Sequence, residues 1–119
     1  MTYPLERLDD DVHQRVRLGI LALLSNVTRA DFTRLREALA TTDGNLGRHL
    51  RVLEEADLIK ISKVIEGRRP RTWVQISKKG RSALRSEIDA LKEIVAIVEG
   101  ESEPVEPARR SLAADPGTA

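Results

Sequence analysis

The chain has 119 residues, with 20 lysines and arginines against 19 aspartates and glutamates, and no cysteine. This length supports one domain with a small core, and the lack of cysteine excludes disulfides, thiolate metal sites and thiol redox sensing. The formal net charge of +1 excludes a chain that is basic throughout. Basic residues nevertheless outnumber acidic ones between Arg48 and Arg85, which predicts a locally basic surface.

The sequence shows no segment typical of membrane insertion or export. The longest strongly apolar stretch, Leu18–Leu24, is far shorter than the roughly 20 residues that span a bilayer, and the acidic N-terminus does not resemble a signal peptide. Residues 100–119 contain prolines and acids but few large apolar residues, a composition typical of disorder. We therefore expect a cytoplasmic protein without a membrane partner, with one domain over residues 1–99 and a disordered tail over 100–119.

Two helices are predicted in the first third of the chain. The first covers about residues 10–25, where apolar residues recur at helical spacing behind three aspartates, Asp9 to Asp11, that suit a helix N-terminus. The second is shorter, with Asp31 as its N-cap, and ends near Leu39. We expect only a connection between the two.

A third helix is predicted over residues 42–56. Thr42 is a good N-cap, and Asp43 suits the positive end of the helix dipole. Three leucines at helical spacing place one face of this helix against a core. At about 100° per residue, the remaining surface is polar. It carries Gly44, Asn45, Gly47, Arg48 and Arg51.

This polar surface has the residue types that read DNA. Arginine can form two hydrogen bonds with a guanine edge, and asparagine can form two with an adenine edge. Two glycines within one short helix lower its stability, and close approach to another surface would account for them. A merely solvated polar surface is the alternative. The second and third helices are separated by only a few residues, a spacing typical of a helix-turn-helix, and this favours DNA binding.

A β-hairpin is predicted after the third helix. Residues 58–65 and 72–76 are rich in β-branched side chains. The connection between them, residues 66–71, contains Arg68, Arg69 and Arg71. Such a loop is either a solvated turn or, beside a recognition helix, a contact to the DNA backbone or the minor groove.

The last predicted helix covers residues 77–99 and has an apolar seam at heptad spacing. This seam could pack on its own domain, but the helix is long for so small a core, so we expect it to pair with a second copy together with the first helix. The expected dimerisation residues are Leu8, Val12, Leu84, Ile88, Leu91, Val95 and Val98. A two-fold dimer would place its recognition helices about 34–36 Å apart on a palindromic site.

The order of these elements, α-α-α-β-β-α, predicts a mainly α fold with a small β-hairpin (α+β), which is a winged helix-turn-helix with a long C-terminal dimerisation helix. From about Leu8 to Leu91 the sequence resembles the winged-helix DNA-binding family of small MarR-like and ArsR-like bacterial transcriptional regulators. The segments that carry the resemblance are His13–Leu21, Asp31–Leu39, Thr42–Leu46, His49–Ala56, Gly67–Trp73 and Ser77–Arg81. Asp57 replaces the family's usual glycine, and aspartate can adopt the left-handed conformation at that turn at some cost.

The resemblance implies a homodimeric, sequence-specific transcriptional regulator, which we expect to be a repressor. The expected DNA-binding residues are Thr42, Asp43, Gly44, Asn45, Arg48, His49, Arg51, Arg68, Arg69 and Arg71. His49 lies beside the leucine face and is expected either to pack there or to contact phosphate. The alternative function is a winged-helix protein-interaction module without specific DNA binding, which loss of the basic residues from the third helix or the hairpin would favour.

Catalysis and metal binding are not indicated by the sequence. No nucleophile, base and oxyanion constellation is present, so we expect no enzyme activity. The chain has no cysteine, and its two histidines, His13 and His49, fall on different predicted helices, so we expect no metal and no cofactor. No residues indicate a small-molecule effector site.

Overall fold

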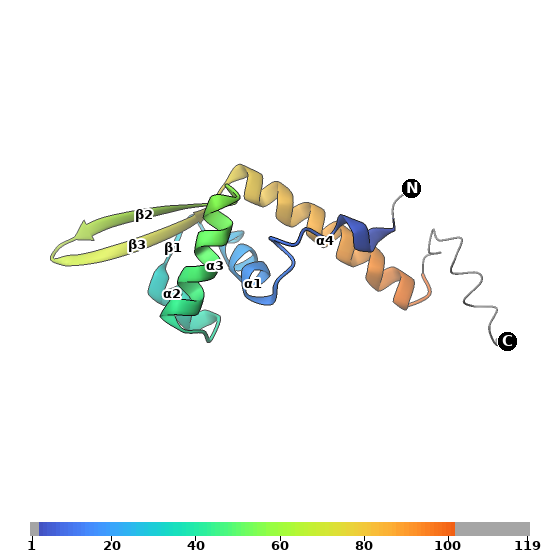
Figure 1. The fold of residues 1–119 in the computed structure, drawn as a ribbon, viewed down its shortest axis with the longest axis horizontal. Helices are drawn as coiled ribbons and strands as arrows, with labels where there is room; N and C mark the ends of the chain where they lie inside the picture. Colours follow the sequence, from blue (N-terminus) through green and yellow to red (C-terminus); the bar gives the residue numbers. More distant parts are fainter. Residues whose placement is uncertain (1–2, 102–119) are drawn as a thin grey trace.

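A computed structural model describes residues 3–101 of the chain (Figure 1). Its elements are η1 (Pro4–Arg7), α1 (Arg15–Leu24), β1 (Ala30–Asp31), α2 (Phe32–Ala38), α3 (Asp43–Glu55), β2 (Ile59–Glu66), β3 (Arg69–Ile76) and α4 (Lys78–Val98). The predicted winged helix-turn-helix is confirmed, with α2 and α3 as the helix-turn-helix and the β2–β3 hairpin as the wing. Nearly all of the predicted tail lies outside the described residues.

Three helices begin where the sequence predicts because each has a side-chain N-cap. Asp31 caps α2, Thr42 caps α3 and Ser77 caps α4, each accepting a hydrogen bond from the backbone amide three residues later, at 2.8 Å, 3.1 Å and 2.9 Å respectively. These bonds satisfy amides that the first turn of a helix leaves unpaired. The local sequence therefore determines where these three helices start.

The first helix is shorter than predicted, and the expectation that the aspartates cap it was wrong. α1 is capped by Gln14, whose Oε1 accepts from the amides of Val16 at 2.9 Å and Arg17 at 3.0 Å. The preceding residues form a turn instead of a helix. That turn buries Val12 completely in the core and brings the amide of Asp9 to α4, which a helix starting near residue 10 would not do.

The sheet has three antiparallel strands in the order β1-β3-β2. β1 was not predicted because it has only two residues, which pair with Val74 and Trp73 of β3. The wing strands are longer than predicted and leave only Gly67 and Arg68 between them. Gly67 has a φ of 66°, which glycine adopts without strain.

The prediction that the tip of the hairpin carries three arginines was therefore wrong. Arg69 and Arg71 belong to strand β3, and only Arg68 lies in the turn. Pro70, which suggested a loop, is compatible with the strand because β1 pairs only with residues 73 and 74, so that β3 is an edge strand at the proline.

The core lies between α1, α3 and the inner face of the sheet. Its fully buried residues include Ile20, Leu21, Leu24, Leu46, Leu53 and Val74. α3 ends at a joint where Asp57 has a φ of 63°, in the left-handed region expected from the sequence. Ser77 closes this joint, since its Oγ donates to the carbonyl of Asp57 at 2.7 Å and its amide donates to the carbonyl of Leu58 at 3.0 Å. The ends of α3 and of the wing thus meet the start of α4.

The two halves of α4 differ in their surroundings. The first half packs on its own domain through Gly80, Leu84 and Glu87. The second half projects away from the body, with η1 lying against it (Figure 1). Leu84 and Val12 belong to the core of the subunit and offer little surface to a partner, which corrects the prediction for these two residues.

Candidate nucleic-acid interface

Most of the residues that were predicted to bind DNA lie on the outward surface of α3. Thr42, Asp43, Gly44, Arg48 and Arg51 are exposed, and Asn45 is half-buried. The leucines of the same helix are buried in the core on its other side. We call the exposed residues together with Asn45 and Gly47 the α3 outer face.

Arg48 on this face is oriented by its neighbours. Its Nη2 donates to Oδ1 of Asn45 at 2.6 Å, and Nδ2 of Asn45 donates to Oγ1 of Thr41 at 2.8 Å. The bond to Asn45 uses one of the five N–H donors of the guanidinium. An arginine aligned in this way loses less side-chain freedom when it binds a partner.

The first turn of α3 also holds a carboxylate, which would repel a phosphate if it were unpaired. Arg36 of α2 offsets it, since its Nη1 donates to Oδ1 of Asp43 at 2.8 Å. This hydrogen bond, with the charge of Asp43, raises the pKa of Arg36 further above its ordinary value. The pair also links the two helices of the helix-turn-helix.

A groove runs between α3 and the wing. A Cβ added to Gly44 or Gly47 would meet no atom within 4 Å, so this part of α3 is open to a close partner. Gly47 lines the groove together with Arg51, Lys63 and Thr72. The groove therefore offers two cations and a hydroxyl along its walls, together with the carboxylate of Glu54.

Lys63 and Thr72 were missed in the sequence analysis. They are direct cross-strand partners in the wing. Alternation along the strands puts them on the same face as the partners Ile61 and Val74, which contact the core. The two-residue period of the strands could have identified them, but only with the correct hairpin register.

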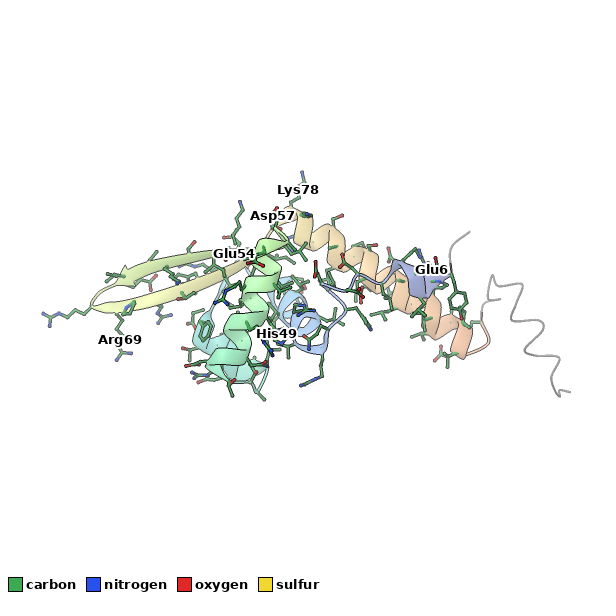
Figure 2. The ribbon with its side chains drawn as sticks, in the orientation of Figure 1. Glu6, His49, Glu54, Asp57, Arg69 and Lys78 are labelled. Carbon is green, nitrogen blue, oxygen red and sulfur yellow. The ribbon has the colours of Figure 1, made fainter. Side chains whose placement is uncertain are left out.

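His49 does not lie on the α3 outer face. It is buried, with 7% exposure, between α3 and α1 (Figure 2). Nη1 of Arg17 lies 3.1 Å from its Nδ1, and because arginine only donates, this nitrogen is the acceptor. Burial, followed by the charges of Arg17 and Arg48, lowers the pKa of His49. Of the two roles expected for His49, packing is the one that the structure supports.

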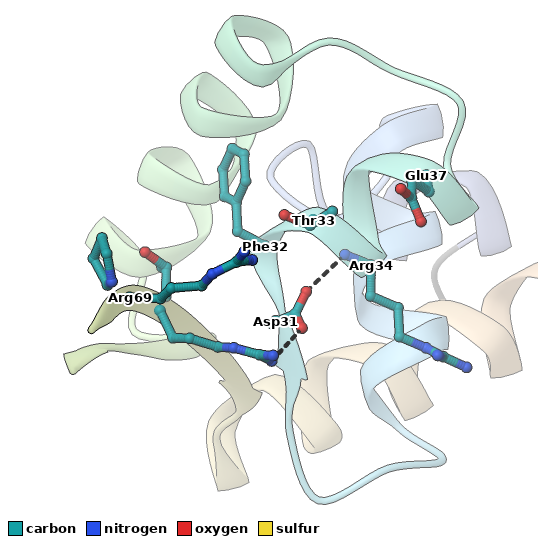
Figure 3. Close-up of a pocket in the computed structure, with 9 residues that line it drawn as sticks. Asp31, Phe32, Thr33, Arg34, Glu37 and Arg69 are labelled. Atoms are coloured by element: carbon teal, nitrogen blue, oxygen red, sulfur yellow. Dashed lines mark hydrogen bonds and ion pairs between the residues drawn. The ribbon is translucent and has the colours of Figure 1, made fainter. Parts of the chain in front are cut away.

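The three wing arginines have different surroundings. Arg68 lies in the turn, and Arg69 reaches outward from the start of β3 (Figure 2). Arg71 instead turns toward the helix-turn-helix, where its Nη1 donates to Oδ2 of Asp31 at 2.8 Å (Figure 3). All three wing arginines are exposed, but Arg71 is paired with an acid, and Arg69 lines the hollow between the wing and α2 together with Asp31 and Arg71 (Figure 3).

A buried carboxylate on α4 was also missed in the sequence analysis. The side chain of Glu87 is fully buried, and its Oε1 accepts from the amide of Asp9 at 3.2 Å. Its Oε2 lies 2.6 Å from Nδ1 of His13. These contacts attach the N-terminal segment to α4. Their partners are more than 70 residues apart in the sequence, so no local pattern indicates them.

The remaining candidates for dimerisation follow the second half of α4 and the N-terminal segment. Leu8, Ile88 and Leu91 are half-buried, whereas Val95 is 51% exposed and Val98 is 79% exposed. Leu5 of η1, which packs on α4, adds a further exposed apolar side chain.

Between residues 3 and 101, no group of three His, Cys, Asp or Glu side chains is placed to hold a metal ion. In the same part of the chain, no helix is both long and apolar enough to cross a membrane.

The fold is that of a winged helix, and comparison with known proteins agrees. The family described as winged helix DNA-binding domain matches residues 16–95, and the chain belongs to this family. The resemblance stated from the sequence is thereby confirmed at the level of this domain.

Individual relatives are similar over most of the domain. An uncharacterized protein of Methanocaldococcus jannaschii is 41% identical over 73 residues, which is 61% of this chain and 79% of the relative. A transcriptional regulator homologue from Pyrococcus horikoshii is 36% identical with a TM-score of 0.72, covering 76% of this chain and 89% of that one. The Mycobacterium tuberculosis regulator MOSR, solved with DNA, shares the fold at 19% identity and a TM-score of 0.63, covering 92% and 78%.

Proposed function

We propose that this chain is a sequence-specific transcriptional regulator that acts as a repressor by placing α3 in the major groove of its operator. The observation that carries the proposal is the α3 outer face, where Arg48 and Arg51 are exposed beside Gly44, which has open space around it. A helix with such a face can lie close to base edges. Repression follows from occupancy of the operator alone and requires no further surface.

The side chains divide into two roles. Arg48 and Asn45 point from the middle of the α3 outer face and are proposed to contact bases, because both types form paired hydrogen bonds with purine edges. Thr42 and Arg51, with Lys63 across the groove, are proposed to contact phosphates. Outward arginines Arg68 and Arg69 are proposed to contact the flanking backbone or the minor groove.

Homodimerisation through the second half of α4 is part of the same proposal. Val95 and Val98 leave an apolar surface on a projecting helix, and such surfaces typically mark interaction sites. A two-fold dimer would present two recognition helices to a palindromic operator. The Pyrococcus regulator homologue and the DNA-bound Mycobacterium regulator support the assignment to transcriptional regulation.

The oligomeric state has a direct test. Val95→Lys adds a charge to a side chain that is already exposed in the subunit, so it should separate the dimer without unfolding it. Sedimentation velocity should show a dimer for the parent and a monomer for this variant. Ser82→Lys, at an exposed position on the first half of α4, is the control and should remain dimeric. A Val95→Lys protein that stays dimeric would place the interface elsewhere.

DNA binding is tested by fluorescence anisotropy with the DNA that flanks the gene and with random duplex, at low and physiological salt. We expect a preference of at least ~1,000-fold for one flanking sequence, persisting at the higher salt. Equal and steeply salt-dependent binding to both duplexes would contradict sequence-specific regulation. Absence of binding even at low salt would favour a protein-interaction module instead.

A further inference from the structure

Paired charges lie along the wing, from Glu66 at the end of β2 to Trp73, where β1 adjoins β3. We call Arg29, Asp31, Glu66, Arg71 and Trp73 the wing-base cluster. Arg71 donates from Nη1 to Oδ2 of Asp31 at 2.8 Å, and its Nε lies 3.7 Å from Oε1 of Glu66. Nε1 of Trp73 donates to Oε2 of Glu66 at 3.0 Å. The guanidinium carbon of Arg29 lies 3.8 Å from the centroid of the Trp73 ring.

Asp31 connects this cluster to the helix-turn-helix. While Oδ2 binds Arg71, Oδ1 caps α2 through the amide of Arg34 at 2.8 Å (Figure 3). The backbone link between the wing and this region is short, because β1 contributes only two residues to the sheet. The side-chain bond therefore extends the attachment of the wing beyond the backbone pairing and joins residues 40 positions apart.

The cluster is balanced in charge, which separates Arg71 from the other arginines of the proposed interface. Arg29 and Arg71 face the two carboxylates of Asp31 and Glu66. Asp31 and Glu66 offset the charge that Arg71 would present to a phosphate. Among the described residues, Arg48, Arg68 and Arg69 have no acidic partner within ion-pair distance, so their full charge can act on DNA.

We propose that Asp31 and Arg71 are positioning residues that fix the angle of the wing against α2, and that Arg71 is not a phosphate contact. The consequence for DNA binding rests on the proposed function, but the attachment of the wing does not. Loss of either residue leaves Arg68 and Arg69 in place while loosening their position relative to α3.

The attachment can be tested in the protein alone, because Trp73 is the only tryptophan of the chain. Asp31→Asn keeps a good N-cap for α2 but presents either a neutral oxygen or an amide donor to Arg71. Arg71→Gln removes the guanidinium, which is the other partner of this hydrogen bond. Both variants should shift the emission of Trp73 and increase its quenching by acrylamide, with helix content unchanged by circular dichroism. Arg68→Gln, an exposed arginine in the turn, is the matched control and should leave both signals unchanged.

The second readout is the salt dependence of DNA binding. Loss of one phosphate contact lowers the slope of log K against log salt by about 0.9, which we expect for Arg69→Gln. Asp31→Asn and Arg71→Gln should weaken binding several-fold at an unchanged slope. The double variant should bind no more weakly than the weaker of the two single variants, because both remove the same interaction.

The outcomes separate this inference from the proposed function. If Trp73 is unaffected in both Asp31→Asn and Arg71→Gln, the positioning role is wrong whatever the DNA result. If Arg71→Gln lowers the slope as Arg69→Gln does, and Asp31→Asn binds more tightly than the parent, Arg71 is a phosphate contact that Asp31 restrains. A parent that binds no DNA would overturn the proposed function, and the Trp73 comparison would then decide the attachment alone.

Discussion

The α3 outer face and the wing-base cluster both expose arginines, but the two regions use them differently. On α3, Arg48 is hydrogen-bonded only to the neutral amide of Asn45 among the described residues, so its charge is not offset. In the wing-base cluster, Arg71 is paired with Asp31 and lies near Glu66. Exposure and basic charge alone therefore do not identify a DNA contact, and the acids around each guanidinium must be considered.

The largest effect is expected at the joint that connects the two regions. A Cβ on Gly80 would overlap the backbone carbonyl of Leu58 and lie 2.9 Å from Cγ1 of Ile76. Gly80→Ala should therefore lower the free energy of unfolding by about 3 kcal/mol, measured by urea denaturation. Gly47→Ala, which has open space, is the control and should not be destabilised. A Gly80→Ala protein as stable as the parent would show that the joint is not tightly packed.

Replacing Arg48 tests the α3 side of the comparison. Arg48→Ala should weaken binding to the preferred duplex by about 1–3 kcal/mol and relax the preference at one base pair. Competition titrations against duplexes with single base changes measure both effects. Arg85→Ala, an exposed arginine on α4, should bind like the parent. If Arg48→Ala binds and discriminates as the parent does, Arg48 is not a reading residue.

Gly44→Ala separates the folding of α3 from its function. No atom lies within 4 Å of the added Cβ, so the free energy of unfolding should rise by about 1 kcal/mol through helix propensity. DNA binding should nevertheless weaken, because the methyl group occupies the space in which a DNA surface would approach. Urea denaturation and anisotropy on the same preparation provide the two values. A variant that is more stable and binds equally well would argue against close approach at this position.

The smallest effect concerns the buried side of α3. Because the pKa of His49 is lower in the folded state, the unfolded state binds its proton first as the pH falls. The contribution of His49 to the free energy of unfolding is therefore complete above its pKa in the unfolded state. This contribution is lost as the pH falls toward its lower pKa in the folded state. Comparing the pH dependence of unfolding of the parent and His49→Gln isolates this contribution. Identical slopes for both proteins in the acidic range would contradict it.

Sequence patterns were sufficient where the interactions are local. The caps of α2 and α3 each join residues three apart, and the leucine face of α3 follows from helical spacing, so both were predicted. The start of α4 at Ser77 was also predicted, although its cap was not. The left-handed Asp57 was anticipated from the family resemblance, because it replaces the usual glycine at that turn.

The missed features depend on contacts between distant segments. Glu87 is buried by the N-terminal turn, and Arg71 is directed by Asp31. The length of the wing was underestimated because Pro70 suggests a loop. The strand can contain this proline only because β1 does not pair with β3 at that position. These features required the tertiary structure, because no periodicity along the chain indicates them.

The central claim is that the α3 outer face reads bases in the major groove, and protection of guanine N7 from methylation tests it most directly. We predict that the parent protects guanines at two positions about one helical turn apart, roughly 34–36 Å, on its preferred duplex. Arg48→Ala, at concentrations that saturate the duplex, should lose that protection. Saturated binding by the parent without any protection of guanine N7 would contradict the account.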